Sequence, residues 1–164
     1  MAKKKKKKTI PLRVRLKRLK IKADKALSEY AREVARREYD NKCPFCHRDP
    51  TTPVWSEKKK KWMNNRWVCF HFISRRRKSV RWDETNVIGA CSFDNAKERN
   101  YPDPYRAFYI RKFGVDKYLA LVDKSIEAFE PTAEFLGGIV DEYVNRLKAL
   151  VSEKTNERDT ANPE

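Results

Sequence analysis

The sequence lacks any apolar run long enough to cross a membrane, and its first residues lack the apolar core of a secretion signal. It is also short of negative charge, because 23 Asp and Glu stand against 39 Lys and Arg, for a formal net charge of +16. We therefore expect a cytoplasmic protein without a membrane span. A positive excess of this size favours an anionic partner, chiefly nucleic acid or a membrane surface, and says nothing about the fold.

The chain of 164 residues is the size of one domain with extensions. Residues 1–22 are almost purely basic, which predicts a largely disordered arm. The arm could be a tail without a target, a nuclear-import signal or a DNA-contacting segment. We favour DNA contact because of the motifs that follow, and its candidate residues are Lys3, Lys4, Lys5, Lys6, Lys7 and Lys8.

Residues 23–41 show helical periodicity. Asp24 can cap a helix, and one apolar face follows at helical spacing, formed by Leu27, Tyr30, Ala31, Val34 and Ala35. This pattern predicts a supporting helix whose apolar face belongs to the core. We place a metal-clipped core in residues 42–114 and further helices and a tail in residues 115–164.

The cysteines are spaced as metal ligands. Cys43 and Cys46 form a C-x2-C pair, a turn that brings two thiolates to one tetrahedral ion. Cys91 and Asp94 form a C-x2-D pair downstream, and carboxylate oxygen is an acceptable zinc ligand. We infer a structural Zn²⁺ held by these four residues, with Cys69 as the rival for the fourth position.

The sequence contains three candidate site residues in the order His71, Asn86 and Asn95. Residues 67–74 alternate as a strand should, with Cys69 and His71 on one face and Phe70 on the other. Residues 81–87 predict a second strand that contains Asn86, and Asn95 lies one turn inside a helix-like segment that starts at Cys91. The basic residues between the two predicted strands are candidate DNA contacts, namely Arg75, Arg76, Arg77, Lys78 and Arg81.

Two further regions complete the chain. Residues 49–66 predict a polar loop, in which Trp55 and Trp62 flank a lysine run. Such tryptophans could stack on unpaired bases or cap a small core. After Pro102 the chain predicts three helices, separated at Gly114 and at Pro131, and the Gly137-Gly138 pair suggests close helix packing in the third.

The order of His71, Asn86 and Asn95 resembles the skeleton of HNH, or ββα-metal, nucleases. More specifically, residues 12–122 resemble the NinG (Rap) family of phage recombination nucleases. The likeness is carried by D-K-x-x-S-E-Y from Asp24, by the C-x2-C pair, by H-F-I-S-R and V-R-W-D-E-T-N-V, and by Y-x2-F followed by F-G. The chain departs from the family pattern at Asp94, where the family has Cys, at Phe70, where it usually has Gly, and at Glu98–Asn100.

The resemblance implies an α+β fold, with a small zinc-clipped ββα-metal core between N- and C-terminal helices. It implies a phosphodiester hydrolase that cuts branched DNA recombination intermediates such as D-loops and Holliday junctions. His71 would be the general base, Asn95 would hold one Mg²⁺ or Mn²⁺ ion, and Asn86 would brace the loop between the strands.

The partners implied are branched DNA and recombination proteins of a phage or its host, in the host cytoplasm. A homodimer would suit a four-way junction, and the C-terminal helices are the candidate surface for it. The competing class is a non-catalytic, zinc-containing, basic nucleic-acid-binding protein. Both classes need the same charge, so composition does not separate them.

Overall fold

The computed structural model describes residues 10–160, with side chains to residue 153, as a mixture of helices and two small antiparallel sheets. In chain order the elements are α1 (Leu12–Glu38), β1 (Val54–Ser56), β2 (Lys61–Met63), β3 (Trp67–His71), the 3-10 helix η1 (Glu84–Asn86), β4 (Val87–Cys91), α2 (Ser92–Lys97), α3 (Asp103–Phe113), α4 (Val115–Ile126) and α5 (Ala133–Thr160). The α+β class predicted from sequence is confirmed. No helix in the described part of the chain is long and apolar enough to span a membrane.

The first helix is much longer than predicted. It begins at Leu12, so residues 12–22 are part of α1 and do not belong to a disordered arm. The reason is that Leu16 and Leu19 recur at helical spacing with the buried Ala23, and both pack against the main apolar cluster. The predicted DNA-contacting residues Lys3–Lys8 lie outside the described residues.

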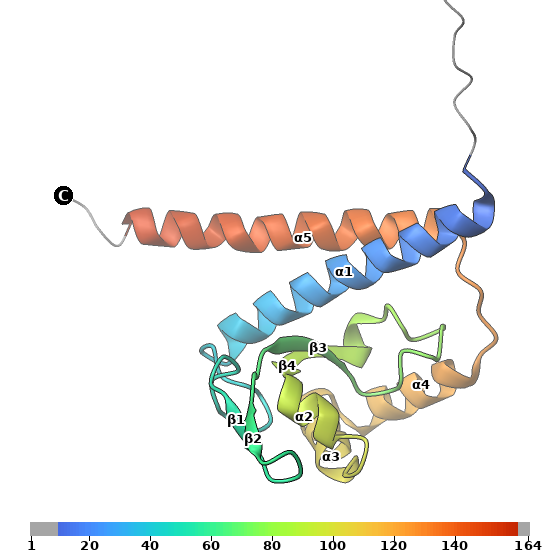
Figure 1. The fold of residues 1–164 in the computed structure, drawn as a ribbon. Coiled ribbons are helices and arrows are strands. Elements are labelled where there is room, and N and C mark those ends of the chain that lie inside the picture. The colour runs from blue at the N-terminus through green and yellow to red at the C-terminus, as the bar shows by residue number, and fades with distance from the viewer. Residues whose placement is uncertain (1–9, 161–164) are drawn as a thin grey trace, which may run out of the picture.

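Helix α1 forms the middle layer of the molecule, between α5 and the β3–β4 sheet, while α2, α3 and α4 lie on the other side of that sheet (Figure 1). Its buried face is rich in alanine, which lets neighbouring backbones approach closely. Gly89 of β4 makes the closest approach. A Cβ there would lie 2.8 Å from the Ala31 carbonyl oxygen and 2.8 Å from the Arg32 Cα.

The central sheet is an antiparallel pair whose limits differ from the prediction. Strand β3 ends at His71, and its partner β4 starts at Val87, so residues 81–86 form turns and η1 instead of a strand. The turn is set by Asp83, whose side chain accepts a hydrogen bond from the Thr85 backbone N–H. The register pairs Trp67 with Cys91 and His71 with Val87.

The three predicted C-terminal helices are present as α3, α4 and α5, and Gly114 separates the first two with a φ of 93°. The predicted close helix packing at Gly137 and Gly138 is wrong, because a Cβ at either position would meet nothing within 4 Å. Helix α5 is tied to the sheet region by Arg146, which donates to both carboxylate oxygens of Glu84 at 2.6 and 2.8 Å.

Candidate metal centre and basic cleft

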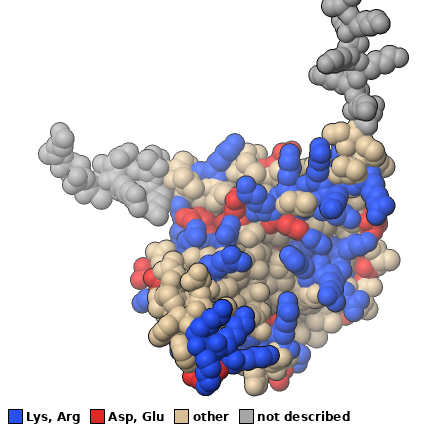
Figure 2. Space-filling model, in the orientation of Figure 1, with Lys and Arg blue, Asp and Glu red and all other residues tan. Residues whose placement is uncertain are grey.

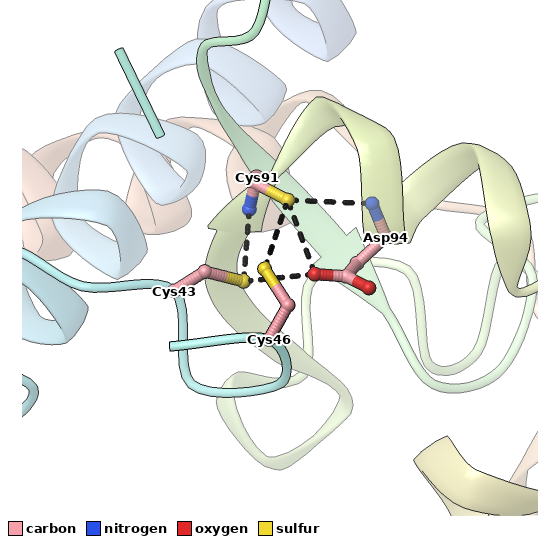
Figure 3. A group of neighbouring side chains, drawn as sticks. All are labelled: Cys43, Cys46, Cys91 and Asp94. Carbon is pink, nitrogen blue, oxygen red and sulfur yellow. Dashed lines mark hydrogen bonds between the residues drawn. The ribbon is translucent and has the colours of Figure 1, made fainter. Parts of the chain in front are cut away.

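Four side chains meet where the turn after α1 touches the junction of β4 and α2 (Figure 3). The ligand atoms of Cys43, Cys46, Cys91 and Asp94 all lie within 4.8 Å of one another. The Sγ atoms of Cys46 and Cys91 are 3.8 Å apart, and Asp94 Oδ2 lies 3.2 Å from Cys43 Sγ and 3.1 Å from Cys91 Sγ. The predicted ligand set is therefore assembled around one point.

This geometry fits a single tetrahedral ion. Zn–S bonds of about 2.3 Å at tetrahedral angles place two sulfurs about 3.8 Å apart, which is the spacing of Cys46 and Cys91. Three thiols and one carboxylate are donors that zinc accepts. The group can thus hold a metal such as zinc.

Local structure explains how each ligand is placed. The C-x2-C turn closes because the His47 N–H donates to the Cys43 carbonyl at 2.9 Å, with His47 at a φ of 56°. Between the two cysteines, the ring of Phe45 packs 4.9 Å from that of Phe70 and 4.8 Å from that of Tyr105. The aromatic core therefore fixes a turn that is too short to have a core of its own.

The second pair of ligands belongs to a helix start. Cys91 ends β4 and caps α2, because its Sγ accepts a hydrogen bond from the Asp94 backbone N–H. The other carboxylate oxygen of Asp94 accepts one from the Tyr105 hydroxyl at 3.2 Å. Tyr105 is thus an outer support for a ligand, a role that sequence reasoning missed.

The four side chains shift one another's pKa values in opposite directions. A hydrogen bond with Cys91 lowers the pKa of the Cys43 thiol to about 7. Burial would raise the pKa of Asp94, but hydrogen bonds from the three cysteines and Tyr105 lower it overall. Burial raises the pKa of Cys46 to about 11. The hydrogen bond with Cys43 and burial raise the pKa of Cys91 well above its ordinary value. The Asp94 carboxylate is therefore the member of the group that is charged at neutral pH.

Cys69, the rival fourth ligand, lies elsewhere. It pairs with Gly89 in the register and packs against the cluster of α1 and α5, on the opposite face of the sheet from Phe70. Burial raises the pKa of its thiol to about 12. Asp94 therefore completes the group, while Cys69 is partly buried and lies outside it.

A separate cleft of about 1040 Å³ lies between α1, β3 and α2. Its lining includes both His71 and Asn95. Basic side chains line it from four segments, namely Lys25, Arg32, Arg66, Arg75, Arg76 and Arg99, against the acidic pair Asp24 and Glu98. Figure 2 shows Lys and Arg side chains on both sides of a hollow below α1. We call this the basic cleft.

His71 lies at the end of β3 with its imidazole fixed by one contact. Its Nε2 lies 3.3 Å from the carbonyl oxygen of Arg81. A carbonyl only accepts, so Nε2 carries the proton and the lone pair is on Nδ1. Burial lowers the pKa of His71 below 6.5, so the ring is neutral at pH 7.

Asn86 lies outside the lining of the basic cleft and is 0% exposed. Its Oδ1 accepts from the Ile73 N–H at 2.7 Å, and its Nδ2 donates to the carbonyls of Ile73 and Val80 at 2.9 Å each. Asn86 therefore braces the loop between the two strands, as predicted, and its side chain does not reach the basic cleft.

Helix α2 contributes Asn95 to the wall of the basic cleft. Glu98, one helical turn later, lines the same cleft and was not selected from the sequence. An amide oxygen and a carboxylate one turn apart are oxygen donors of the kind that Mg²⁺ and Mn²⁺ prefer.

The predicted DNA contacts divide into two groups. Arg75 and Arg76 line the basic cleft, and Arg77 is exposed beside it. Arg81 is instead paired with Asp24, and Lys78 with Glu130, so Arg81 is a structural residue and not an available phosphate contact. Asp24 is likewise no helix cap, since it lies well inside α1.

No protein-family model matches the chain, and comparison with curated proteins and with solved structures likewise finds no match.

Proposed function

We propose that the protein is a metal-dependent DNA endonuclease of the ββα-metal type, acting on branched recombination intermediates. One observation carries the proposal. A neutral histidine, with its proton placed on Nε2 by a backbone carbonyl, shares a basic cleft with an asparagine from the helix that follows the strand pair. This is the arrangement that a general base for attack on a phosphodiester requires.

The order of elements supports the same class. Strands β3 and β4 form an antiparallel pair, and α2 follows β4 without a connecting loop. His71 comes from the end of the first strand, Asn86 from the connection and Asn95 from the helix. The resemblance to the NinG family supplies the preference for branched substrates.

The proposed chemistry starts at Nδ1 of His71, which takes a proton from the attacking water. Asn95 would hold the divalent ion, with the Glu98 carboxylate as a further oxygen donor and water completing the shell. A bound Mg²⁺ or Mn²⁺ ion would neutralise charge on the phosphoryl oxygens and on the leaving 3′ oxygen. The products would be 5′-phosphate and 3′-hydroxyl ends.

The Cys43, Cys46, Cys91 and Asp94 group would hold a structural zinc ion. Because Cys91 and Asp94 lie at the start of α2, the ion would fix that helix relative to β4. Asn95 follows Asp94 directly, so the zinc would also fix the position of Asn95 in the basic cleft. It would take no part in hydrolysis.

A nicking assay with added Mg²⁺ or Mn²⁺, run on four-way junction, D-loop, linear duplex and single-stranded DNA, tests the proposal. His71→Asn should lower the cleavage rate by about 10²- to 10⁴-fold, which is the usual rate contribution of a general base. It should leave DNA binding nearly unchanged. His47→Asn is the matched control, because His47 lies on the cysteine turn outside the lining of the basic cleft. It should cleave like the wild type.

A second outcome would favour the competing class. If folded wild-type protein binds DNA but cuts none of these substrates with either metal, the chain is a zinc-containing binding protein. Full activity of a folded His71→Asn variant would also contradict the mechanism.

A further inference from the structure

The β1–β2 hairpin has two exposed tryptophans on one face. Trp55 and Trp62 are directly opposite each other in the register, with ring centroids 5.7 Å apart at an interplanar angle of 69°. They remain 41% and 66% exposed. Their strand neighbours Val54 and Met63 are partly buried and face the other way.

Packing does not account for this exposure. A cross-strand aromatic pair helps to stabilise a hairpin whose strands have only three residues each. Neither indole belongs to an apolar cluster of the described residues, however, and the two strands pack chiefly against each other. The possibility that these tryptophans cap a small core is thus eliminated, and two large aromatic surfaces face solvent.

The same hairpin carries concentrated positive charge. The turn between its strands contains the exposed lysines Lys58, Lys59 and Lys60, and the exposed Lys61 is the first residue of β2. Lys60 is paired with Glu57 at 2.8 Å, and the other three make no ion pair within the described part of the chain. Figure 2 shows a dense group of basic side chains at the lower edge of this face, in the region where Figure 1 places the hairpin tip.

The base of the hairpin is joined to a wall of the basic cleft. Only residues 64–66 separate β2 from β3, and Arg66 lines the cleft. Asn65 Oδ1 accepts from the Ser92 hydroxyl at 3.0 Å, and the Ser92 N–H donates to the Arg66 carbonyl at 2.8 Å. The hairpin is therefore fixed to the start of α2, the helix that carries Asn95.

We propose that the β1–β2 hairpin is a stacking site for unpaired DNA bases next to the point of cleavage. Exposed aromatic faces stack on any base, and neighbouring lysines attract the backbone phosphates. A duplex in the basic cleft would place its unpaired strand or branch point against Trp55 and Trp62. The proposal deepens the nuclease function, because it assigns the preference for branched DNA to these two side chains.

The test uses binding and needs no cleavage. The His71→Asn protein is titrated, by fluorescence anisotropy, with a blunt duplex and with the same duplex ending in a fork of unpaired strands. Trp55→Ile and Trp62→Ile together remove the stacking surface but keep residues that favour strands. We expect the double variant to lose about tenfold in affinity for the fork, and to bind the blunt duplex unchanged.

Two controls separate stacking from charge and from loss of the hairpin. Trp55→Phe with Trp62→Phe keeps an aromatic pair, so it should retain most of the fork preference. Lys58→Gln with Lys59→Gln should weaken both DNAs and reduce the slope of log affinity against log salt by about 0.9 per phosphate released. A 2-aminopurine base in the fork should change its fluorescence on binding the tryptophan protein but not the isoleucine variant.

Three results would overturn the proposal. One is an unchanged fork preference in a folded isoleucine variant, and another is an equal loss for fork and blunt duplex. The third is that the tryptophan substitutions weaken binding to phosphatidylserine vesicles but leave the affinity for the fork unchanged. That result would identify a membrane-contacting hairpin. Binding is measured here with a cleavage-impaired protein, so the stacking proposal can be confirmed or rejected whether or not the wild type cuts DNA in the nicking assay.

Discussion

Asp24 and Arg81, 57 residues apart, form a two-point ion pair that positions His71. The Arg81 Nε donates to Asp24 Oδ1 at 2.9 Å, and the Trp82 indole N–H donates to the same oxygen at 3.0 Å. The carbonyl of Arg81 is the group that accepts from His71 Nε2. A carboxylate on α1 therefore holds the peptide that contacts His71, and we expect Asp24 to be a positioning residue for the proposed general base.

Asp24→Asn should lower kcat by about tenfold, the lower end of the usual cost of losing an outer support, with little change in KM. Losing hydrogen bonds to a partly exposed charged pair should also cost about 1–2 kcal/mol of unfolding free energy. Asp24 raises the pKa of His71 through its charge, so the acid limb of the pH–rate profile should shift to lower pH. Asp141→Asn, on the exposed face of α5, is the control. If the acid limb of the pH–rate profile does not shift in Asp24→Asn, Asp24 has a purely structural role.

The lowered pKa of His71 predicts how cleavage should depend on pH. Burial holds the pKa below 6.5, and a general base works only when neutral. The acid limb of kcat/KM should therefore have its midpoint below pH 6.5. The unfolded chain binds this proton more readily, so the contribution of His71 to stability is present above about pH 6.5 and is lost as the pH falls through the folded-state pKa. Activity that falls with a midpoint above 6.5 would show that another group titrates.

The sequence predicted what short-range spacing determines and missed what depends on distant contacts. The Cys43, Cys46, Cys91 and Asp94 group and the presence of three C-terminal helices follow from local patterns, so both were predicted from sequence. Strand β4 was misplaced because all five of its residues are buried and no alternation marks it. The early start of α1 was hidden by its basic residues. The Asp24–Arg81 pair joins residues that no single-sequence pattern relates.

The metal centre can be tested without an activity assay. Purified protein should contain one zinc ion per chain, and Asp94→Ala should weaken zinc binding by more than the roughly 10- to 100-fold typical of losing an outer support. Asp94→Cys supplies a thiolate in the same place and should retain the ion. Cys69→Ser should also retain it, because Cys69 lies outside the ligand group. Metal analysis and thermal unfolding with and without chelator are the measurements, and zinc lost from the Cys69 variant alone would reject the ligand set.

Gly89 sets how closely β4 can approach α1. A Cβ there would lie 2.8 Å from backbone atoms of Ala31 and Arg32, so Gly89→Ala must push the two elements apart. We expect a loss of about 1–3 kcal/mol in the free energy of unfolding by urea. Gly138→Ala in α5 is the matched control, since its Cβ would meet nothing within 4 Å, and it should stabilise the helix by about 0.5–1 kcal/mol. Equal effects at the two positions would contradict the close approach.

Neighbouring arginines can show whether DNA enters the basic cleft. Arg76 lines the cleft, and the exposed Arg77 next to it does not. If a phosphate contacts Arg76, Arg76→Gln in the His71→Asn protein should weaken duplex binding and reduce the slope of log affinity against log salt by about 0.9, the value for one phosphate. Arg77→Gln removes the same charge from the same turn, so general electrostatic attraction should fall equally in both variants, and only a direct contact should distinguish them. Affinities measured across a salt series decide between the two cases. Identical slopes for the two variants would mean that DNA passes over the turn without entering the cleft. His71 would then not contact its proposed substrate.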